Sequence, residues 1–193
     1  MANIDSRTGL RPINNGVAGT APRVRPYLPA ASVIYKNALL NLTAAGLVTM
    51  VTTGAASSYI VGTAAYHVAA GTAGAESREV LVYDDPAQEY VVQSDDGTLK
   101  SLADYMGRLY GLLSNASGNT VTKDSLGELD GNSGTSVQTV TAICLQCVGL
   151  YDQIGNAVVS GSATDSSNAD FIVKVVPDMH IFSKGKTRTA AGV

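Results

Sequence analysis

The sequence predicts an all-β protein: a single antiparallel domain over residues 32–183, shaped as a β-barrel or a jelly-roll-like fold, with one short helix and an extended N-terminal arm. Three observations lead to this expectation. Short runs of β-branched and aromatic residues alternate with turn residues through the whole range. Only 15% of the residues are charged, and Gly, Ala, Ser and Thr are abundant, which suits many turns and small-residue strands. Residues 1–31, in contrast, hold four of the six prolines.

Residues 80–97 are predicted to form the central hairpin. Val80–Tyr83 leads into the turn sequence Asp84-Asp85-Pro86-Ala87, and a second Val-rich run follows and ends at Gln93. Aspartate can hydrogen-bond its own backbone at the start of a turn, and proline presets φ for a corner position. Both runs carry apolar side chains on both faces, so we expect this hairpin to lie inside a sheet that is covered on two sides.

The other predicted strands flank this hairpin along the chain. Gly62 falls inside one of them, which indicates a bulge or a close approach of two backbones. A turn at Thr43–Gly46 joins two of the runs into another hairpin. The predicted strands are 33–35, 38–42, 47–52, 59–69, 137–151, 158–159, 171–176 and 179–182.

One helix is predicted, over Ser101–Leu113. Apolar residues recur there at steps of three and four residues, the spacing of one helical face. Ser101 and Asp104 have the form of a capping box with Asp in place of the usual Glu. The polar, Gly-rich residues 114–118 and 127–136 are predicted to form a long surface loop.

Residues 1–31 are predicted to form an extended arm that is not packed within its own chain. Proline removes a backbone donor and biases the preceding residue away from helix. Four arginines against one aspartate give this segment a net charge of +3 (4 − 1), so the rest of the chain sums to −6 (−3 − 3). Two interpretations stay open, a disordered tail or an arm that becomes ordered against another subunit. Residues 184–193 form a basic C-terminal tail.

No catalytic, cofactor-binding or metal-binding site is expected. Cys144 and Cys147 match C-x-x-C, but residues three apart on a strand face opposite sides, which favours two buried structural cysteines. A structural zinc site needs four ligands, and only His67 and His180 could complete one. The sequence contains neither G-x-S-x-G nor a phosphate-binding glycine loop. The aspartates of the turns at 84–85 and 95–96 lack calcium-loop spacing.

Charge and hydropathy restrict the partners. The net charge of −3 argues against nucleic acid, and no apolar run approaches the roughly 18–20 residues that cross a membrane. The polar start of the chain predicts no secretory signal. We therefore expect a soluble protein made in a reducing cytoplasm.

Several short motifs, taken in order, are similar to those of a known family. The block Val82-Tyr83-Asp84-Asp85-Pro86, followed by Gln93, is the most specific of them. The others are Gly9–Pro12, Tyr35–Asn37, Gly62–Ala65, Glu128–Asp130, Phe171–Val175 and His180–Phe182. Together they resemble the decoration (cement) proteins of tailed-bacteriophage capsids, over most of residues 9–182. The chain departs from that family at Pro177–His180, where an Asn-Glu-His ending is common, and in its basic tail.

The resemblance implies a non-catalytic virion protein on the outer capsid surface, made in the cytoplasm of a bacterial host. It implies a homo-oligomer, dimer or trimer, that cements neighbouring capsomers of the major capsid protein. We expect the arm to make this contact through its charged and aromatic side chains. The expected contact residues are Arg7, Arg11, Arg23, Arg25 and Tyr27. The alternative is a carbohydrate- or receptor-binding component of a phage particle, which calls for a groove lined with aromatic residues. An enzyme would need His67 or His180 in a pocket with a carboxylate and a hydroxyl.

Overall fold

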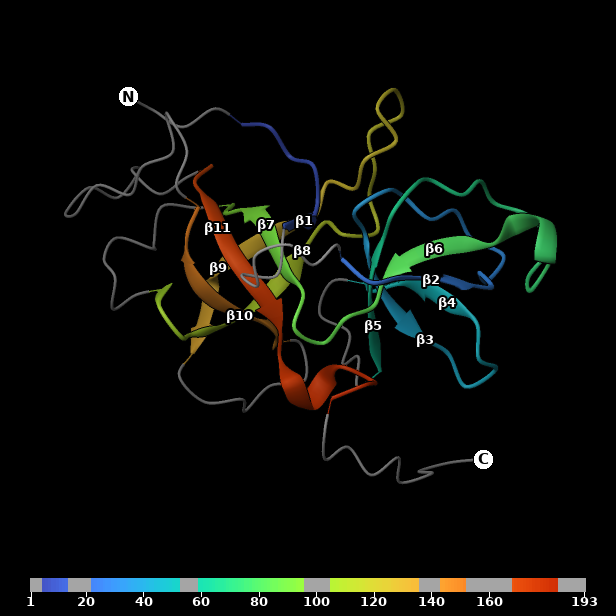
Figure 1. Cartoon of the computed structure of the whole chain (residues 1–193). Helices are drawn as coiled ribbons and strands as arrows, with labels where there is room; N and C mark the ends of the chain where they lie inside the picture. Colours follow the sequence, from blue (N-terminus) through green and yellow to red (C-terminus); the bar gives the residue numbers. More distant parts are fainter. Residues whose placement is uncertain are drawn as a thin grey trace.

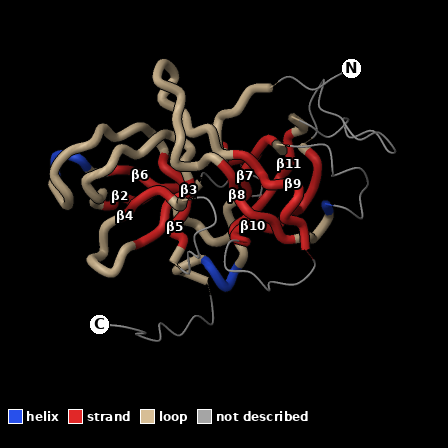
Figure 2. Tube along the Cα trace, turned by 180° about the vertical axis from the view of Figure 1, so that it is seen from behind, coloured by secondary structure: helices blue, strands red, loops and turns tan. Residues whose placement is uncertain are grey.

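Eleven strands form two antiparallel sheets in the computed structural model, which describes residues 5–13, 22–52, 59–95, 105–135, 143–151 and 168–183. The six-stranded sheet has the order β1 (Arg11–Ile13), β7 (Glu89–Gln93), β11 (Asp170–Val175), β10 (Ile143–Leu150), β8 (Leu109–Leu113), β9 (Glu128–Thr135). The five-stranded sheet has the order β2 (Val24–Tyr27), β6 (Val80–Tyr83), β5 (Ile60–Ala64), β3 (Leu39–Leu42), β4 (Val48–Met50). Figure 1 shows the two sheets side by side, and the view from behind agrees (Figure 2).

The all-β prediction is therefore confirmed, with the strands divided between two sheets. Within the described residues neither sheet closes into a barrel, because β1 and β9 remain the edges of one sheet and β2 and β4 the edges of the other. Two short 3-10 helices, Glu76–Arg78 and Pro177–Met179, lie in the described ranges, and Tyr105 has α-helical geometry. No helix in these ranges has the length and apolar character needed to cross a membrane.

One buried cluster joins the two sheets. Leu39 and Ile60 of the five-stranded sheet pack there with Tyr90, Leu145 and Phe171 of the six-stranded sheet. A second cluster lies on the other face of the five-stranded sheet and contains Leu40, Val61, Val80 and Val82 with Ile34 and Val68 from the adjoining segments. Burial on both faces explains why β5 and the start of β3 are apolar on both sides. The expectation of cover on two sides is wrong for β6, because Leu81 is 38% exposed.

Gly62 lies where two backbones come close together, as the sequence predicted. Its φ is +147°, and a Cβ at this position would lie 1.8 Å from the carbonyl oxygen of Tyr83. The register of β3 against β5 also shifts here, between Leu40 and Asn41. Only glycine fits such an approach.

The predicted central hairpin is wrong in its pairing. Val80–Tyr83 and Glu89–Gln93 are both strands, and the turn between them exists, with Gln88 N–H bonded to Asp85 O at 3.0 Å. However, β6 pairs with β2 and β5, whereas β7 pairs with β1 and β11. The turn therefore carries the chain from one sheet to the other.

Three further expectations need correction. The predicted helix is wrong at Leu109–Leu113, which is strand β8, while residues 101–104 lie outside the described residues. The predicted loop over 127–136 contains β9. Residues 179–182 form the end of a 3-10 helix and a turn instead of a strand, although His180 makes one bridge to Ile60. The predicted strand at 158–159 and the C-terminal tail fall outside the described residues.

The N-terminal segment is packed within its own chain wherever it is described. Arg11–Ile13 pairs with β7, and Val24–Tyr27 pairs with β6. Leu10 has no exposed surface and belongs to the cluster between the sheets. The prolines do keep the segment extended, but it forms sheet edges, so the expectation of an unpacked arm is wrong for these residues. Residues 14–21 lie outside the described ranges.

Candidate functional site

The five contact residues predicted from the sequence fall into two separate groups. Arg7 and Arg11 lie at the edge of the six-stranded sheet, and Arg23, Arg25 and Tyr27 lie at the edge of the five-stranded sheet. All four guanidinium groups are paired with carboxylates of the same chain. Whether any of these residues also contacts a partner stays a prediction.

In the first group, each arginine holds a carboxylate that is largely buried. Arg7 Nε lies 3.1 Å from Glu128 Oε1 and 3.1 Å from Asp5 Oδ1. Arg11 Nη2 lies 3.2 Å from Asp170 Oδ2. Burial raises the pKa of Glu128, and the Arg7 charge opposes that rise. The hydrogen bond to Asp5 raises the pKa of Arg7. These pairs fasten the first strand to its own sheet.

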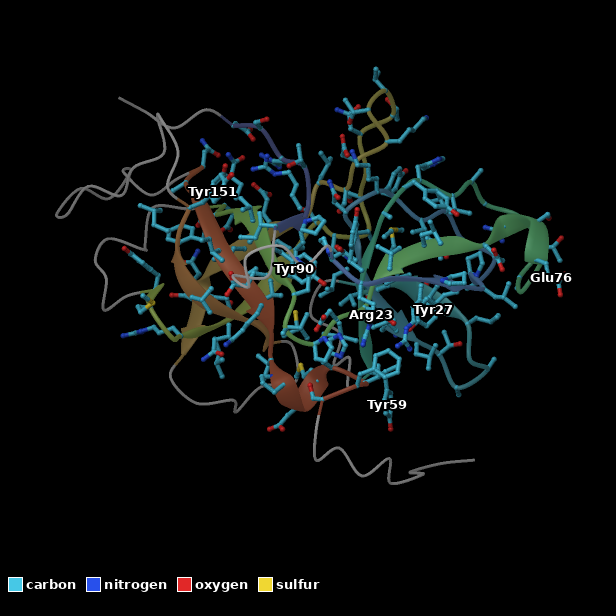
Figure 3. All side chains as sticks on the ribbon, in the orientation of Figure 1. Arg23, Tyr27, Tyr59, Glu76, Tyr90 and Tyr151 are labelled. Atoms are coloured by element: carbon cyan, nitrogen blue, oxygen red, sulfur yellow. The ribbon has the colours of Figure 1, made fainter. Side chains whose placement is uncertain are left out.

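In the second group, the side chains converge on Asp84, whose carboxylate is fully buried at the end of β6. Arg23 donates from Nε to Oδ1 at 2.7 Å and from Nη2 to the Asp84 carbonyl oxygen. Tyr27 donates its hydroxyl to Oδ2 at 2.8 Å, and Arg25 Nε lies 3.6 Å from the same oxygen. Figure 3 shows Arg23 near the junction of the two sheets and Tyr27 beside it over the five-stranded sheet.

An aromatic ring and a histidine from the C-terminal segment complete this cluster. The centroid of the Phe182 ring lies 5.5 Å from the guanidinium carbon of Arg23 and 5.5 Å from that of Arg25. His180 is buried and accepts a hydrogen bond at Nδ1 from the Phe182 backbone N–H at 3.2 Å. We call the six residues Arg23, Arg25, Tyr27, Asp84, His180 and Phe182 the Asp84 cluster. It joins the second strand, the exit of β6 and residues 180–182.

The local environment explains the titration of the cluster. Burial lowers the pKa of His180 to about 4, with Arg23 acting in the same direction and Asp84 opposing it. His180 is therefore neutral at pH 7. Burial and the hydrogen bond to Asp84 raise the pKa of Tyr27. Tyr27 thus remains a neutral donor to a charged carboxylate.

The Asp84 cluster contains a carboxylate, a hydroxyl and a histidine, but its contacts do not form a catalytic relay. Asp84 accepts from Arg23 and Tyr27, and within the described residues His180 makes no hydrogen bond to it. The geometry is that of an ion-pair joint in which a buried charge is fully compensated.

The cysteines are buried free thiols, as predicted, but the expectation that they face opposite sides of the strand is wrong. Cys144 and Cys147 both lie in the cluster between the sheets, where a register shift between Ile143 and Leu145 interrupts the regular alternation of β10. Burial raises the pKa of each thiol to about 12. No group of three or more metal-ligating side chains occurs within the ranges that the structure describes.

Residues 114–127 form a hairpin that stands away from both sheets, which we call the projecting hairpin (Figures 1 and 2). Gly118 and Ser125 pair across it, and Asn119 N–H bonds to Asp124 O at 2.9 Å. At the tip, Asn119 Oδ1 accepts from the backbone N–H groups of Val121 at 2.8 Å and Thr122 at 3.0 Å. Val121 is 85% exposed, more than any other large apolar side chain described.

The base of the projecting hairpin is held on several sides. Lys36 exchanges backbone hydrogen bonds with Lys123 O at 3.0 Å and Ser125 N–H at 2.8 Å, and its side chain pairs with Asp124 at 3.5 Å. A Cβ on Gly118 would lie 2.2 Å from the ring of Tyr35, so the ring occupies the space that glycine leaves. The tip is thereby presented on a fixed support.

A buried amide ties this hairpin to the sheets. Asn115 donates to the carbonyl oxygens of Leu39 at 2.9 Å and Val51 at 2.8 Å, and it accepts from Leu39 N–H at 2.7 Å. It is 1% exposed. The base of the projecting hairpin is therefore bonded to the backbone of β3 and of the residue that follows β4.

This hairpin was not predicted from the sequence, which indicated a long surface loop that includes residues 114–118. The available signal was Asn119, whose side chain can bond to the backbone two and three residues later and so stabilise a turn. An apolar Val121 within polar neighbours was the second sign.

Beside the projecting hairpin lies an open cleft of about 380 Å³. Its walls are residues 5–8 on one side and residues 119–126 on the other. The lining residues are Asp5, Ser6, Arg7, Thr8, Asn119, Thr122, Asp124 and Leu126. Most of the lining residues are polar, Leu126 is apolar, and none is aromatic.

Comparisons with protein-family models, curated proteins and solved structures found no match to this chain.

Proposed function

We propose that this chain is a structural protein that binds the outer surface of a tailed-phage capsid and cements neighbouring subunits of the major capsid protein. The proposal starts from the sequence resemblance to decoration proteins over residues 9–182. It involves no catalytic step. The homo-oligomer, the virion location and the capsid partner all belong to the proposal.

The observation that carries the proposal is the projecting hairpin. A valine that is 85% exposed costs hydration free energy in the isolated protein, and its neighbours at the tip are polar. Asn119 holds the tip in a single turn, and Lys36 and Tyr35 hold its base. Such a rigid apolar tip suits insertion into a socket on a partner surface.

The rigidity of the N-terminal segment also favours binding to a partner surface. The described parts of residues 1–31 are fixed by strand pairing and ion pairs, so they lose little conformational freedom when a partner binds. This differs from the sequence-based picture of an arm that orders only on the shell.

The experiment is binding of the purified chain to shells assembled from the major capsid protein encoded by the same genome. Shells are sedimented with wild-type protein, with Val121→Asp and with Met106→Asp as a matched control, since Met106 is also an exposed apolar residue, at 50%. We expect wild type and Met106→Asp to sediment with the shells. We expect Val121→Asp to bind about tenfold more weakly, with an unchanged melting temperature.

Two results would contradict the proposal. If wild-type protein stays in the supernatant at every shell concentration, the decoration function is wrong. If Val121→Asp binds as tightly as wild type, the hairpin is not the contact.

The carbohydrate-binding alternative finds less support in the described residues. Sugar sites usually stack aromatic rings against the sugar, and the cleft beside the projecting hairpin is lined without any.

A further inference from the structure

The Asp84 cluster carries more positive than negative charge at its surface. Two guanidinium groups face one carboxylate, and within the described residues Asp84 is the only carboxylate paired with Arg23 or Arg25. His180 adds no charge at neutral pH because burial keeps it deprotonated. The formal charges of the six cluster residues therefore sum to +1, while the Asp85 carboxylate next in the chain also acts on His180.

The geometry assigns that surplus to Arg25. Arg23 is engaged by two hydrogen bonds to Asp84, one to the carboxylate and one to the carbonyl oxygen. Arg25 approaches Asp84 only to 3.6 Å, and no described residue accepts a hydrogen bond from its guanidinium group. Its side chain is 51% exposed, against 36% for Arg23.

Arg25 is also held in place. Phe182 lies 5.5 Å from its guanidinium carbon, and this ring is itself 40% exposed. The strand partner Val82 fixes the backbone of Arg25 within the β2–β6 pair. The Arg25 guanidinium group is thus held between a buried carboxylate and an aromatic ring while about half of its side chain stays exposed.

We propose that Arg25, stacked on Phe182, forms a binding site for one Asp or Glu carboxylate of the capsid subunit on which the protein docks. A carboxylate matches the two parallel N–H groups of a guanidinium, and the exposed ring beside it supplies apolar contact for the methylene groups of that acid. This inference rests on the proposed function and names its chemical partner at this edge of the molecule.

The four arginines thereby separate into two roles. Arg7, Arg11 and Arg23 stabilise the fold through carboxylates of their own chain. Arg25 alone among them retains a guanidinium group without a hydrogen bond in the described structure. The surplus charge of the N-terminal segment is thus concentrated at one residue.

The test compares Arg25→Gln with Arg11→Gln in the shell-sedimentation assay at low and raised salt. Arg11 is a matched control because it lies on the same segment and is 43% exposed, yet is already paired with Asp170 at 3.2 Å. We expect Arg25→Gln to weaken shell binding about tenfold at low salt and less at high salt. Arg11→Gln should bind within about twofold of wild type. Phe182→Leu should weaken binding partially while both arginines remain.

Melting curves of every variant establish that the fold is retained, and Arg25→Lys, which keeps the charge without the planar fork, should be intermediate. If wild type binds and folded Arg25→Gln binds equally well, the Arg25 site is wrong and the decoration function stands. If wild type fails to bind, the decoration function itself is wrong. If Arg25→Gln instead changes the oligomeric state of free protein in sedimentation velocity, the carboxylate belongs to a second copy, and the assignment to the capsid subunit is overturned.

Discussion

Arg23 and Asp84 form the ion pair that fastens the N-terminal segment to the point where the chain leaves the five-stranded sheet. Their Nε and Oδ1 atoms are 2.7 Å apart, and the Asp84 carboxylate has no exposed surface. Tyr27 supplies a second hydrogen bond to the same carboxylate at 2.8 Å. The pair therefore links residues 61 positions apart in the sequence.

Removing the buried carboxylate should be destabilising. We expect Asp84→Ala to lower the free energy of unfolding by about 1–3 kcal/mol, because it removes the acceptor of the Arg23 and Tyr27 hydrogen bonds. Urea denaturation followed by circular dichroism measures this. Asp5→Asn is the control, since both partners of the Asp5–Arg7 pair are exposed and such pairs contribute at most about 1 kcal/mol. A loss below about 1 kcal/mol for Asp84→Ala would show that the Asp84 cluster is not a joint of the fold.

The N-terminal segment should contribute to stability through Leu10. This side chain has no exposed surface and packs between the sheets, so Leu10→Ala should cost about 2–5 kcal/mol. Deleting residues 2–28 should lower the melting temperature for the same reason. Ile13→Ala, in the neighbouring half-buried strand, should cost less. A truncated protein that melts like the full-length chain would restore the picture of an unpacked arm.

Stability should fall between pH 6.5 and about 4 because of His180. Its pKa is lowered to about 4 in the folded protein, from an ordinary value of 6.5, so the unfolded chain binds the additional proton in this window. The contribution of neutral His180 to the free energy of unfolding is complete above pH 6.5. It decreases as the pH falls to about 4, by at most about 3 kcal/mol.

His180→Asn isolates this effect from that of the carboxylates. An Asn oxygen can accept the Phe182 N–H in place of Nδ1 but does not titrate. The difference in unfolding free energy between wild type and the variant should therefore change with pH only in this window. Parallel pH profiles for the two proteins would mean that His180 has the same pKa in the folded and unfolded states.

The cysteines should react with a thiol reagent only after unfolding. Burial raises the pKa of Cys144 and Cys147 to about 12, which lowers the thiolate fraction at neutral pH on the order of a thousandfold relative to a free cysteine. We expect no reaction with an aromatic disulfide reagent at pH 8 in the native protein and two thiols per chain in urea. Rapid labelling of native protein would place a thiol at the surface.

Local patterns predicted the strands well where one signal dominated. Val80–Tyr83, Ile60–Ala64 and Asp170–Val175 are strands, as their β-branched composition indicates, and Gly62 does mark a close backbone approach. The turn at Thr43–Gly46 is also present, with Gly46 N–H bonded to Thr43 O at 3.0 Å.

Pairing could not be predicted in the same way. A turn sequence such as Asp84–Ala87 specifies a reversal of direction, but not whether the next strand joins the same sheet. Here the buried Asp84 carboxylate is engaged by Arg23 and Tyr27, which lie far away in the sequence. Strand β8 was mistaken for a helix because a strand buried on both faces is apolar at nearly every position, and this also satisfies helical spacing.

The candidate site was predicted only in part. Residue type and local charge singled out four arginines, but their carboxylate partners come from distant strands, so the sequence did not distinguish Arg25 from the other three. The exposure of Val121 depends on how the projecting hairpin is anchored by Lys36 and Asn115. Neither anchor has a local sequence signature.

Cryo-EM of shells assembled with the wild-type protein tests the central claim most directly. We predict density for this chain on the outer capsid surface, with Val121 in an apolar socket and Arg25 against a carboxylate of the capsid subunit. Shells whose outer surface is bare at saturating protein would contradict the decoration function, and bound protein with the projecting hairpin directed to solvent would contradict the contact.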